Sequence, residues 1–355
     1  MSSSSSTTPS VSDRSQAQNL FTDTKHAEDY ARYRPVYPST VFDIIKEYSD
    51  RIYSTPSSTV SSSTTTNNST SRTLVADIAT GSGQAAIGLA TIYESVIGID
   101  ASAAQVEAGT ATPPASNITF RVGTAESTGL DTESMDAVCV AEALHWFNQE
   151  LFWKEVNRIL KPGGIVIIIG YAGSKISGNQ IANISFTNLF VNILGSYWHP
   201  NKTIIDNLYK NYEPSNKEFQ NIERYDHLTM EKYWSVDACI GNSHSWSAYI
   251  TYLQNNPHII KGSPEDPSEI LRKQLNYALQ EHNDTINGST SSSTSLPDYI
   301  IPITNENTRG YGFGVSKVTV PLDHEQTEEE KIKRQQGYFH MVWPLTVILA
   351  QKPRK

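Results

Sequence analysis

The segment that decides the fold is "TLVADIATGSGQAAIG", residues 73–88, in which an apolar run passes through closely spaced glycines into a second apolar run. The stretch "LVADI" has the composition of a buried strand, and the residues from Gln84 to Tyr93 have the pattern of a helix. Gly81 and Gly83 stand in the loop between them, where the missing Cβ allows a sharp turn and lets backbone N–H groups approach a ligand closely. The segment therefore predicts a strand, a ligand-binding loop and a helix.

The same alternation continues along the chain. The next elements that the pattern predicts are the strand "SVIGID", a helix from Ser102 to Ala108, the strands "ITFRVG" and "MDAVCVA", a helix from Asn148 to Leu160, and the strand "IVIIIG". Strands that alternate with helices are joined by right-handed crossovers and lie parallel. We therefore expect an α/β fold, a doubly wound and mostly parallel seven-stranded sheet with helices on both faces.

The predicted organisation has four parts. Residues 1–18 form a disordered tail, residues 19–171 form a ligand-binding core, residues 172–300 form a helical cap inserted after the fifth strand, and residues 301–355 supply the closing strands, "GVSKVTVPL" and "LTVILA". The Ser/Thr/Asn tract 54–72 and the tract 287–295 are predicted to be disordered, because their composition buries too little apolar area to offset the entropy of ordering. The cap carries many Trp and Tyr residues and is expected to build the substrate pocket.

Composition excludes several classes of protein. The net charge of -9 and the absence of a large Lys/Arg cluster argue against a nucleic-acid partner. The two cysteines, Cys139 and Cys239, are too few for a disulfide framework and lack the spacing of a zinc site, so no metal is expected. The longest aliphatic run, residues 165–169, is far shorter than a membrane span. We expect a cytoplasmic protein with a small-molecule ligand, no membrane association and no obligate protein partner.

The acidic residues near the glycine loop indicate which ligand binds. Asp100 closes the second predicted strand, where a carboxylate can accept hydrogen bonds from both hydroxyls of a ribose. Gly81, Gly83 and Ala86 also satisfy a dinucleotide fingerprint, so a nicotinamide dehydrogenase stays open on the glycines alone. Asp77 lies four residues before Gly81, where it would repel a pyrophosphate but suit a ligand that carries an ammonium and a sulfonium group. The pattern favours a cationic adenosine ligand.

These motifs resemble a known family. The series Asp77-x-x-x-Gly81-x-Gly83, Asp100, "VGTAES", "MDAVCVAEALHWF" and "ILKPGGIVIIIGYA" resembles the class I S-adenosylmethionine-dependent methyltransferases, which have a Rossmann-like fold. The stretches "YARYRPVYP", "AEALHWF", "GYA", "GSYWHP" and "HSWSAY" are more narrowly similar to the fungal trans-aconitate methyltransferases, which methylate small carboxylates. Ala79 departs from the family pattern, because it replaces the first glycine of the loop.

The resemblance implies a set of site residues. S-adenosylmethionine would be held by residues from the ends of the first four strands, namely Asp77, Ala79, Gly81 and Gly83 at its methionine portion, Asp100 at its ribose, Ala125 and Glu126 at its adenine, and Glu142 beside the donor methyl group. The catalytic residues would be His145 and Trp146, and the residues facing the small acid would be Tyr33, Arg34, Trp198 and His199.

Each residue also has a simpler interpretation. Asp100 can cap the following helix, Glu126 can be a solvated loop acid, His145 can be a hydrogen-bonded core residue or a general base, Arg34 can form a plain salt bridge, and Trp198 can be a core aromatic. The cations that would hold an acidic substrate stay open among Arg32, Arg34, Lys175, Lys202 and His199. The function alternatives are a methyltransferase for another small acceptor, such as a lipid, a hydroxyl or a nitrogen nucleophile, and a non-catalytic S-adenosylmethionine sensor.

Overall fold

A computed structural model describes residues 35–54, 72–111, 113–286, 332–333 and 336–354. Tyr33 and Arg34 lie outside these residues, as do the tracts 1–18 and 287–295 and most of the tract 54–72. Among the described helices, none has both the length and the apolar character that crossing a membrane requires.

The sheet confirms the predicted fold class. Its strands are β1 Leu74–Ile78, β2 Ser95–Asp100, β3 Ile118–Val122, β4 Met135–Ala141, β5 Leu160–Tyr171, β6 Lys175–Ser177, β7 Gln220–Trp234 and β8 Phe339–Gln351. The order is β3-β2-β1-β4-β5-β8-β6, and β7 pairs with β8. The first five strands are parallel, whereas β6 and β7 run antiparallel to β8. Because β6 pairs with residues 340–342 and β5 with residues 345–351 of β8, the eight strands occupy seven positions across the sheet.

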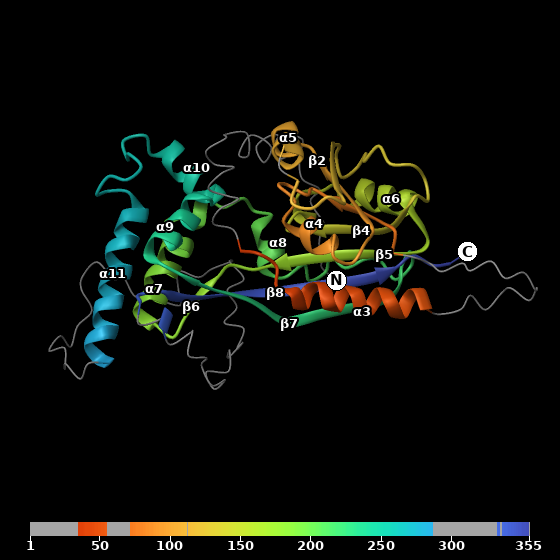
Figure 1. Ribbon diagram of the computed structural model, residues 1–355. Coiled ribbons are helices and arrows are strands. Elements are labelled where there is room, and N and C mark those ends of the chain that lie inside the picture. The colour runs from red at the N-terminus through yellow and green to blue at the C-terminus, as the bar shows by residue number, and fades with distance from the viewer. Residues whose placement is uncertain (1–34, 55–71, 112, 287–331, 334–335, 355) are drawn as a thin grey trace, which may run out of the picture.

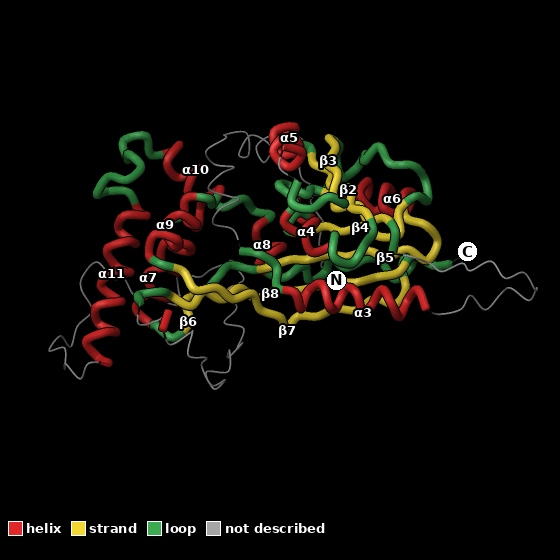
Figure 2. The backbone as a smooth tube through the Cα atoms, viewed as in Figure 1, coloured by secondary structure: helices red, strands yellow, loops and turns green. Residues whose placement is uncertain are grey.

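Helices cover both faces of this sheet, because alternate residues of each buried strand point to opposite sides. One face packs against α3 Ser39–Ser54 and α4 Gln84–Leu89, and the other packs against α6 Gln149–Ile159 and α8 Lys202–Asp206. A fifth helix of this part, α5 Ala103–Ala111, follows β2. Figure 2 shows the strands as one continuous layer between these helices.

The remaining helices gather at one end of the molecule (Figure 1). They are α7 Gln180–Thr187, which continues into a π-helical turn at Asn188–Ile193, then α9 Val236–His244, α10 Ser247–Asn255 and α11 Pro267–Ile286. We call these helices the cap. Their aromatic side chains pack edge to face, with the Trp246 ring 5.4 Å from Phe186 and 5.1 Å from Phe190.

The structure contains one strand that the sequence did not predict. It is β7, which lies inside the span predicted to be cap and pairs with β8. The predicted strand at 314–322 lies outside the described residues and stays a prediction. Most β7 side chains are only partly buried, so its sequence lacks the apolar run that marks an inner strand. The cap therefore consists of two segments, one on each side of β7.

Candidate functional site

The first loop of the sheet has the backbone that its glycines predict. Ala79, Gly81 and Gly83 all lie in the left-handed region, with φ of 57°, 57° and 90°. A Cβ placed on Gly81 would meet no atom within 4 Å, so the space beside this residue is open. A Cβ on Gly83 would lie 3.0 Å from the Phe120 ring, so this glycine is required by its φ and by packing inside the protein. Open space for a ligand therefore lies beside Gly81, and the approach of a ligand to this loop stays a prediction.

Asp77 is the penultimate residue of β1 and a buried acid that is 1% exposed. Its Oδ2 accepts a hydrogen bond of 2.7 Å from the Thr80 hydroxyl, and its Oδ1 has no partner among the described residues. Burial raises its pKa from 3.8 to about 7, against hydrogen bonding that lowers it. A buried carboxylate oxygen without a donor fits the ammonium group of S-adenosylmethionine, which would supply both charge and hydrogen bonds.

Asp100 connects the loop to the next helix. Its Oδ2 accepts from the Gly81 N–H and its Oδ1 from the Ser102 N–H, each at 2.8 Å. Asp100 thus bonds the residue that precedes α5, and Ser102 itself caps the helix by accepting from the Gln105 N–H. Burial raises the pKa of Asp100, and these backbone hydrogen bonds oppose the rise. A carboxylate has about four acceptor positions, so two remain for ribose hydroxyls.

The residues after β3 lie beside the start of α6. Ala125 is buried, and Glu126 Oε1 accepts a 2.9 Å hydrogen bond from the Asn148 N–H. Asn148 in turn caps α6 by accepting from the Leu151 N–H. Glu126 is therefore tied to the structure instead of being a solvated loop acid.

The turn after β4 brings together three predicted residues. Glu142 has φ of 59°, its N–H donates to the Ile169 carbonyl oxygen, and its Oε1 accepts from the Tyr171 N–H. These bonds tie the end of β4 to the end of β5. A single 3-10 turn, Leu144–Trp146, follows and positions His145 and Trp146 with their ring centroids 4.8 Å apart.

His145 is held from two sides. Its Nδ1 lies 3.0 Å from the Tyr209 hydroxyl, and its carbonyl oxygen accepts from Asn201 Nδ2 at 2.8 Å. Burial lowers the pKa of His145 to about 3, and the electrostatic influence of Lys202 and His199 acts in the same direction. The imidazole is therefore neutral throughout the physiological pH range.

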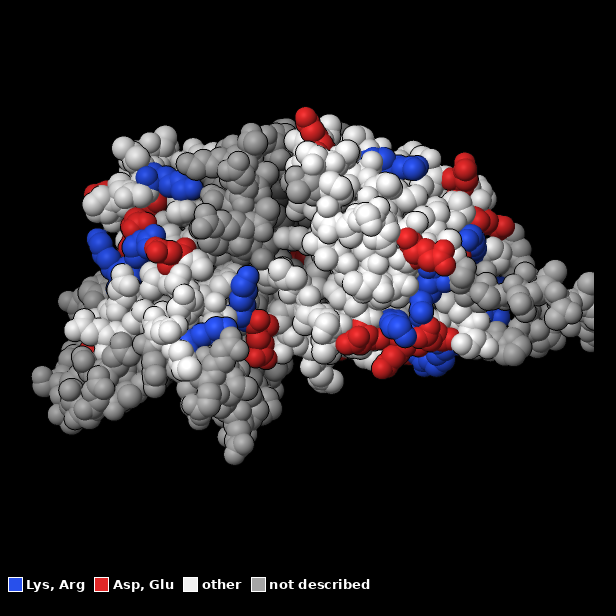
Figure 3. All heavy atoms as spheres, in the orientation of Figure 1, with Lys and Arg blue, Asp and Glu red and all other residues white. Residues whose placement is uncertain are grey.

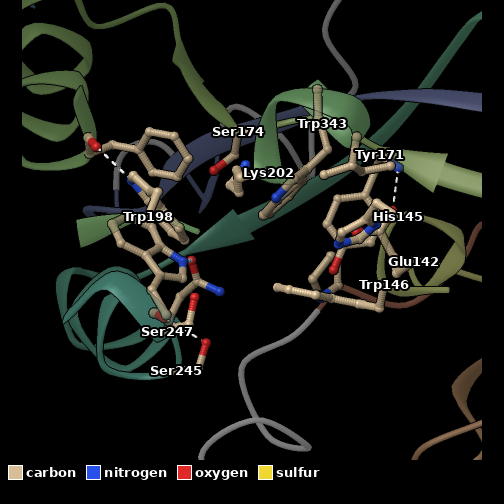
Figure 4. Close-up of a pocket in the computed structure, with 17 residues that line it drawn as sticks. Glu142, His145, Trp146, Tyr171, Ser174, Trp198, Lys202, Ser245, Ser247 and Trp343 are labelled. Carbon is tan, nitrogen blue, oxygen red and sulfur yellow. Dashed lines mark hydrogen bonds between the residues drawn. The ribbon is translucent and has the colours of Figure 1, made fainter. Parts of the chain in front are cut away.

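A cavity of about 120 Å³ opens beside this turn. In Figure 4, Trp198 and Ser245 lie on one side and Glu142, His145 and Trp146 on the other. Its walls are aromatic and polar, with Trp146, Tyr171, Phe190, Trp198, Trp246 and Trp343 among the aromatic residues, and Ser174, Lys202, Asn242, Ser245 and Ser247 among the polar ones.

Of the two predicted substrate residues in the described part of the chain, one lines the cavity and the other does not. Trp198 lines the cavity and donates its indole N–H to the Phe190 carbonyl oxygen at 2.9 Å. It therefore forms part of the cavity wall and also packs in the protein core. His199 does not line the cavity and lies behind Trp146, with ring centroids 4.9 Å apart.

Two residues of the site were not selected from sequence. Lys202 was only one of five candidate cations, and the structure places it on the cavity wall through α8. Tyr209 lies 64 residues from His145, and no spacing in the sequence signals their contact.

Comparisons with known proteins agree with this geometry. Residues 76–168 match the family model described as "Methyltransferase domain". A "Putative methyltransferase" of Dictyostelium discoideum is 29% identical over 276 residues, which cover 78% of this chain and 91% of that protein. An "Uncharacterized methyltransferase" of Schizosaccharomyces pombe is 42% identical over 53 residues, which are 15% of this chain and 21% of that protein. The structure of a "Putative Type II Methyltransferase" from Anaeromyxobacter dehalogenans has a TM-score of 0.57 at 20% identity and covers 91% of this chain and 100% of that one.

The chain therefore carries a class I S-adenosylmethionine-dependent methyltransferase domain. It is an enzyme of this class, and S-adenosylmethionine is its cofactor. The predicted enzyme class and cofactor are confirmed. The similarity to trans-aconitate methyltransferases stays a prediction.

Proposed function

We propose that this enzyme transfers the methyl group of S-adenosylmethionine to a carboxylate of a small acid, such as trans-aconitate, and forms a methyl ester. The observation that carries the proposal is an ammonium group, that of Lys202, on the wall of an aromatic cavity at the carboxyl ends of β4 and β5. A second carboxylate of the acid would bind this cation, while the apolar part of the acid packs on the aromatic rings.

The cofactor end of the site lies on the first loops of the sheet. Asp77 Oδ1 would accept from the cofactor ammonium group, and Asp100 would bind the ribose with its remaining lone pairs. Gly81, with open space beside it, would let the loop backbone approach the methionine portion. Ala125 and Glu126 would lie at the adenine, where the turn that Glu126 anchors leads into α6.

The acceptor end depends on Lys202. Its Nζ bonds Asp206 and lies 4.9 Å and 5.0 Å from the ring centroids of Phe190 and Trp198. An ammonium group has three N–H donors, so Asp206 leaves donors for an anion in the cavity. Aromatic faces stabilise the cation without neutralising it. Tyr33 and Arg34 remain predicted contributors from outside the described residues.

The proposed methyl transfer requires mainly that the acid and the donor methyl group are aligned. S-adenosylmethionine, when bound, supplies an electrophilic methyl group, and a carboxylate can accept it without a general base. His145 and Trp146 would orient the acid and exclude water at the ends of β4 and β5, which is where positioning contributes most to such a displacement.

The test uses the full-length enzyme with S-adenosylmethionine and a panel of mono-, di- and tricarboxylic acids, together with alcohol and amine analogues. Mass spectrometry would follow S-adenosylhomocysteine and the methylated product, and mild alkali would identify an ester by its hydrolysis. We expect di- or tricarboxylic acids to be the best acceptors. Products formed only from alcohols or amines would overturn the proposal, and cofactor binding without turnover on any acceptor would indicate a sensor.

A matched pair of variants tests the role of the cation. Lys202→Met keeps the length of the side chain and removes its charge, and it should raise KM for the acid about tenfold or more with unchanged affinity for S-adenosylhomocysteine. Lys175→Met is the control, because Lys175 lies on β6 and does not line the cavity. Equal effects of the two substitutions would contradict the assignment of Lys202.

A further inference from the structure

Tyr209 is a fully buried residue held in an uncommon backbone conformation. It follows α8, and both it and Leu208 have left-handed φ values, 57° and 53°. Bulky side chains seldom adopt this region, and strained backbone of this kind concentrates at functional sites. The conformation brings the Tyr209 hydroxyl to 3.0 Å from Nδ1 of His145.

This contact determines where the protons lie. Within the described part of the chain, Nδ1 of His145 is the partner of the Tyr209 hydroxyl in a side-chain hydrogen bond. If Nδ1 carried the imidazole proton, the Tyr209 O–H would be a buried donor without an acceptor. If Nδ1 is unprotonated, the hydroxyl donates to it and both groups are satisfied. The second arrangement should be favoured at least about fivefold in population.

The Tyr209 hydroxyl keeps its proton at neutral pH. Burial raises the pKa of Tyr209 well above its ordinary value, because the charged phenolate is disfavoured away from water. That proton is therefore available to donate to Nδ1 of His145.

We propose that Tyr209 is a positioning residue that fixes His145 as the neutral tautomer with its proton on Nε2, so that His145 donates a hydrogen bond into the cavity and does not act as a general base there. The His145 ring lines the cavity, and among the described residues its side-chain hydrogen bond is the one at Nδ1 with Tyr209.

The neighbouring charges support a neutral ring. Lys202 and His199 both act to lower the pKa of His145, and burial lowers it most. Glu142 lines the same cavity, where its Oε1 accepts from the Tyr171 N–H. The charged or titratable groups around His145 are thus Lys202, His199, Tyr209 and Glu142, and the imidazole stays neutral among them.

The tautomer has a consequence for the acceptor, and this part rests on the proposed function. An Nε2–H group can donate to one oxygen of a carboxylate and leave the other oxygen to accept the methyl group. It cannot take a proton from an alcohol or amine at the same nitrogen. Tyr209 thereby favours an acceptor that is already ionised.

The experiment is a long-range ¹H–¹⁵N correlation spectrum of the full-length protein labelled at histidine, recorded at neutral pH with and without S-adenosylhomocysteine. The spectrum of His145→Gln assigns the His145 signals by their loss. We expect the Nε2–H tautomer pattern, unchanged when S-adenosylhomocysteine binds. A dominant Nδ1–H tautomer or an imidazolium ring at neutral pH would overturn the proposal.

Variants then test Tyr209 itself. Tyr209→Phe keeps the ring and removes the hydroxyl. The population ratio of the Nε2–H to the Nδ1–H tautomer of His145 should therefore fall at least about fivefold relative to wild type. Tyr48→Phe is the matched control, since it removes another buried hydroxyl that bonds the Asn221 carbonyl oxygen on β7. An unchanged His145 pattern in folded Tyr209→Phe would refute the role of Tyr209. If that variant does not fold, the wild-type spectrum still decides the tautomer.

The spectrum also separates this inference from the proposed function. It reads the tautomer without turnover, so a missing acid substrate would leave the result intact. Conversely, methyl ester formation together with the Nδ1–H tautomer would refute only the positioning role.

Discussion

Replacing Asp77 with asparagine should change protein stability in a way that depends on pH. Burial raises the pKa of Asp77 from 3.8 to about 7, so the folded chain binds this proton more tightly than the unfolded chain does. The folded state is therefore favoured most below pH 3.8, and this contribution is lost as the pH rises through about 7. At 1.36 kcal/mol for each tenfold change in proton affinity, the cost of ionisation reaches roughly 4 kcal/mol above pH 7.

The size of the effect can be followed between two pH values. Linkage gives an ionisation cost of roughly 1.5 kcal/mol at pH 5 and roughly 4 kcal/mol at pH 8 for the wild-type protein. Asparagine has no such cost, although its amide carries a small penalty at both pH values because its second group is buried without a partner. The stability difference between Asp77→Asn and wild type should therefore shift by about 2–3 kcal/mol in favour of the variant from pH 5 to pH 8.

The assay is urea unfolding of both proteins at each pH, with Asp43→Asn on the exposed side of α3 as the control for loss of one carboxylate. Calorimetry with S-adenosylhomocysteine, which retains the ammonium group, should show about 10- to 150-fold weaker binding by Asp77→Asn, as loss of a charged hydrogen bond costs about 1.5–3 kcal/mol. A stability difference that does not change with pH, together with undiminished affinity, would refute the reasoning.

Three further predictions concern the same domain. Asp100→Ala should weaken S-adenosylhomocysteine binding by about 2–4 kcal/mol and reduce the free energy of unfolding by about 1 kcal/mol, because the carboxylate also accepts hydrogen bonds from the Gly81 and Ser102 N–H groups; unchanged calorimetric affinity would remove it from the site. Ala79→Gly should stabilise the protein by up to about 1 kcal/mol and so raise its melting temperature slightly, because relief of the backbone strain at φ of 57° exceeds the entropy cost of glycine. A lower melting temperature would contradict this prediction. For Glu155, the effect of burial is outweighed by hydrogen bonds from Arg158 and Thr128, which lower the pKa of its carboxyl to about 2. Glu155→Gln should therefore reduce the free energy of unfolding by about 3 kcal/mol above pH 4.5, and by progressively less towards pH 2. Denaturant unfolding of both proteins across this range measures the difference, and a difference that does not change with pH would contradict the prediction.

The sequence predicted the fold and the backbone of the glycine loop because their signals are local. The inner strands β1, β2 and β4 contain short apolar runs, and Asp77 and Asp100 stand near strand ends that the topology brings to one edge. The left-handed backbone at Gly81 and Gly83 follows directly from their lack of Cβ. Such features need no knowledge of distant contacts.

The closing strand and the acceptor cavity depend on distant contacts instead. The strand β7 pairs with β8 along much of its length and exposes many polar side chains, so its composition does not distinguish it from a loop. Lys202 meets its aromatic neighbours and His145 meets Tyr209 only after the cap and α8 pack on the sheet. Figure 3 shows acidic and basic groups interspersed on one face of the molecule. Ion pairs between distant parts of the sequence, such as Arg51 with Glu223, likewise form only in the folded chain.

The two ends of the site are built from different parts of the chain. The glycine loop 79–83 follows β1, whereas the cavity takes its walls from α8, the cap helices and Trp343 on β8. The turn after β4 also lines the cavity, and Glu142 there bonds both the Ile169 carbonyl oxygen and the Tyr171 N–H. Because these bonds fix the turn to β5, the His145 ring is oriented before any ligand binds, and positioning of this kind lowers the cost of aligning an acceptor. Cap substitutions can therefore change the acceptor while the cofactor loop stays intact.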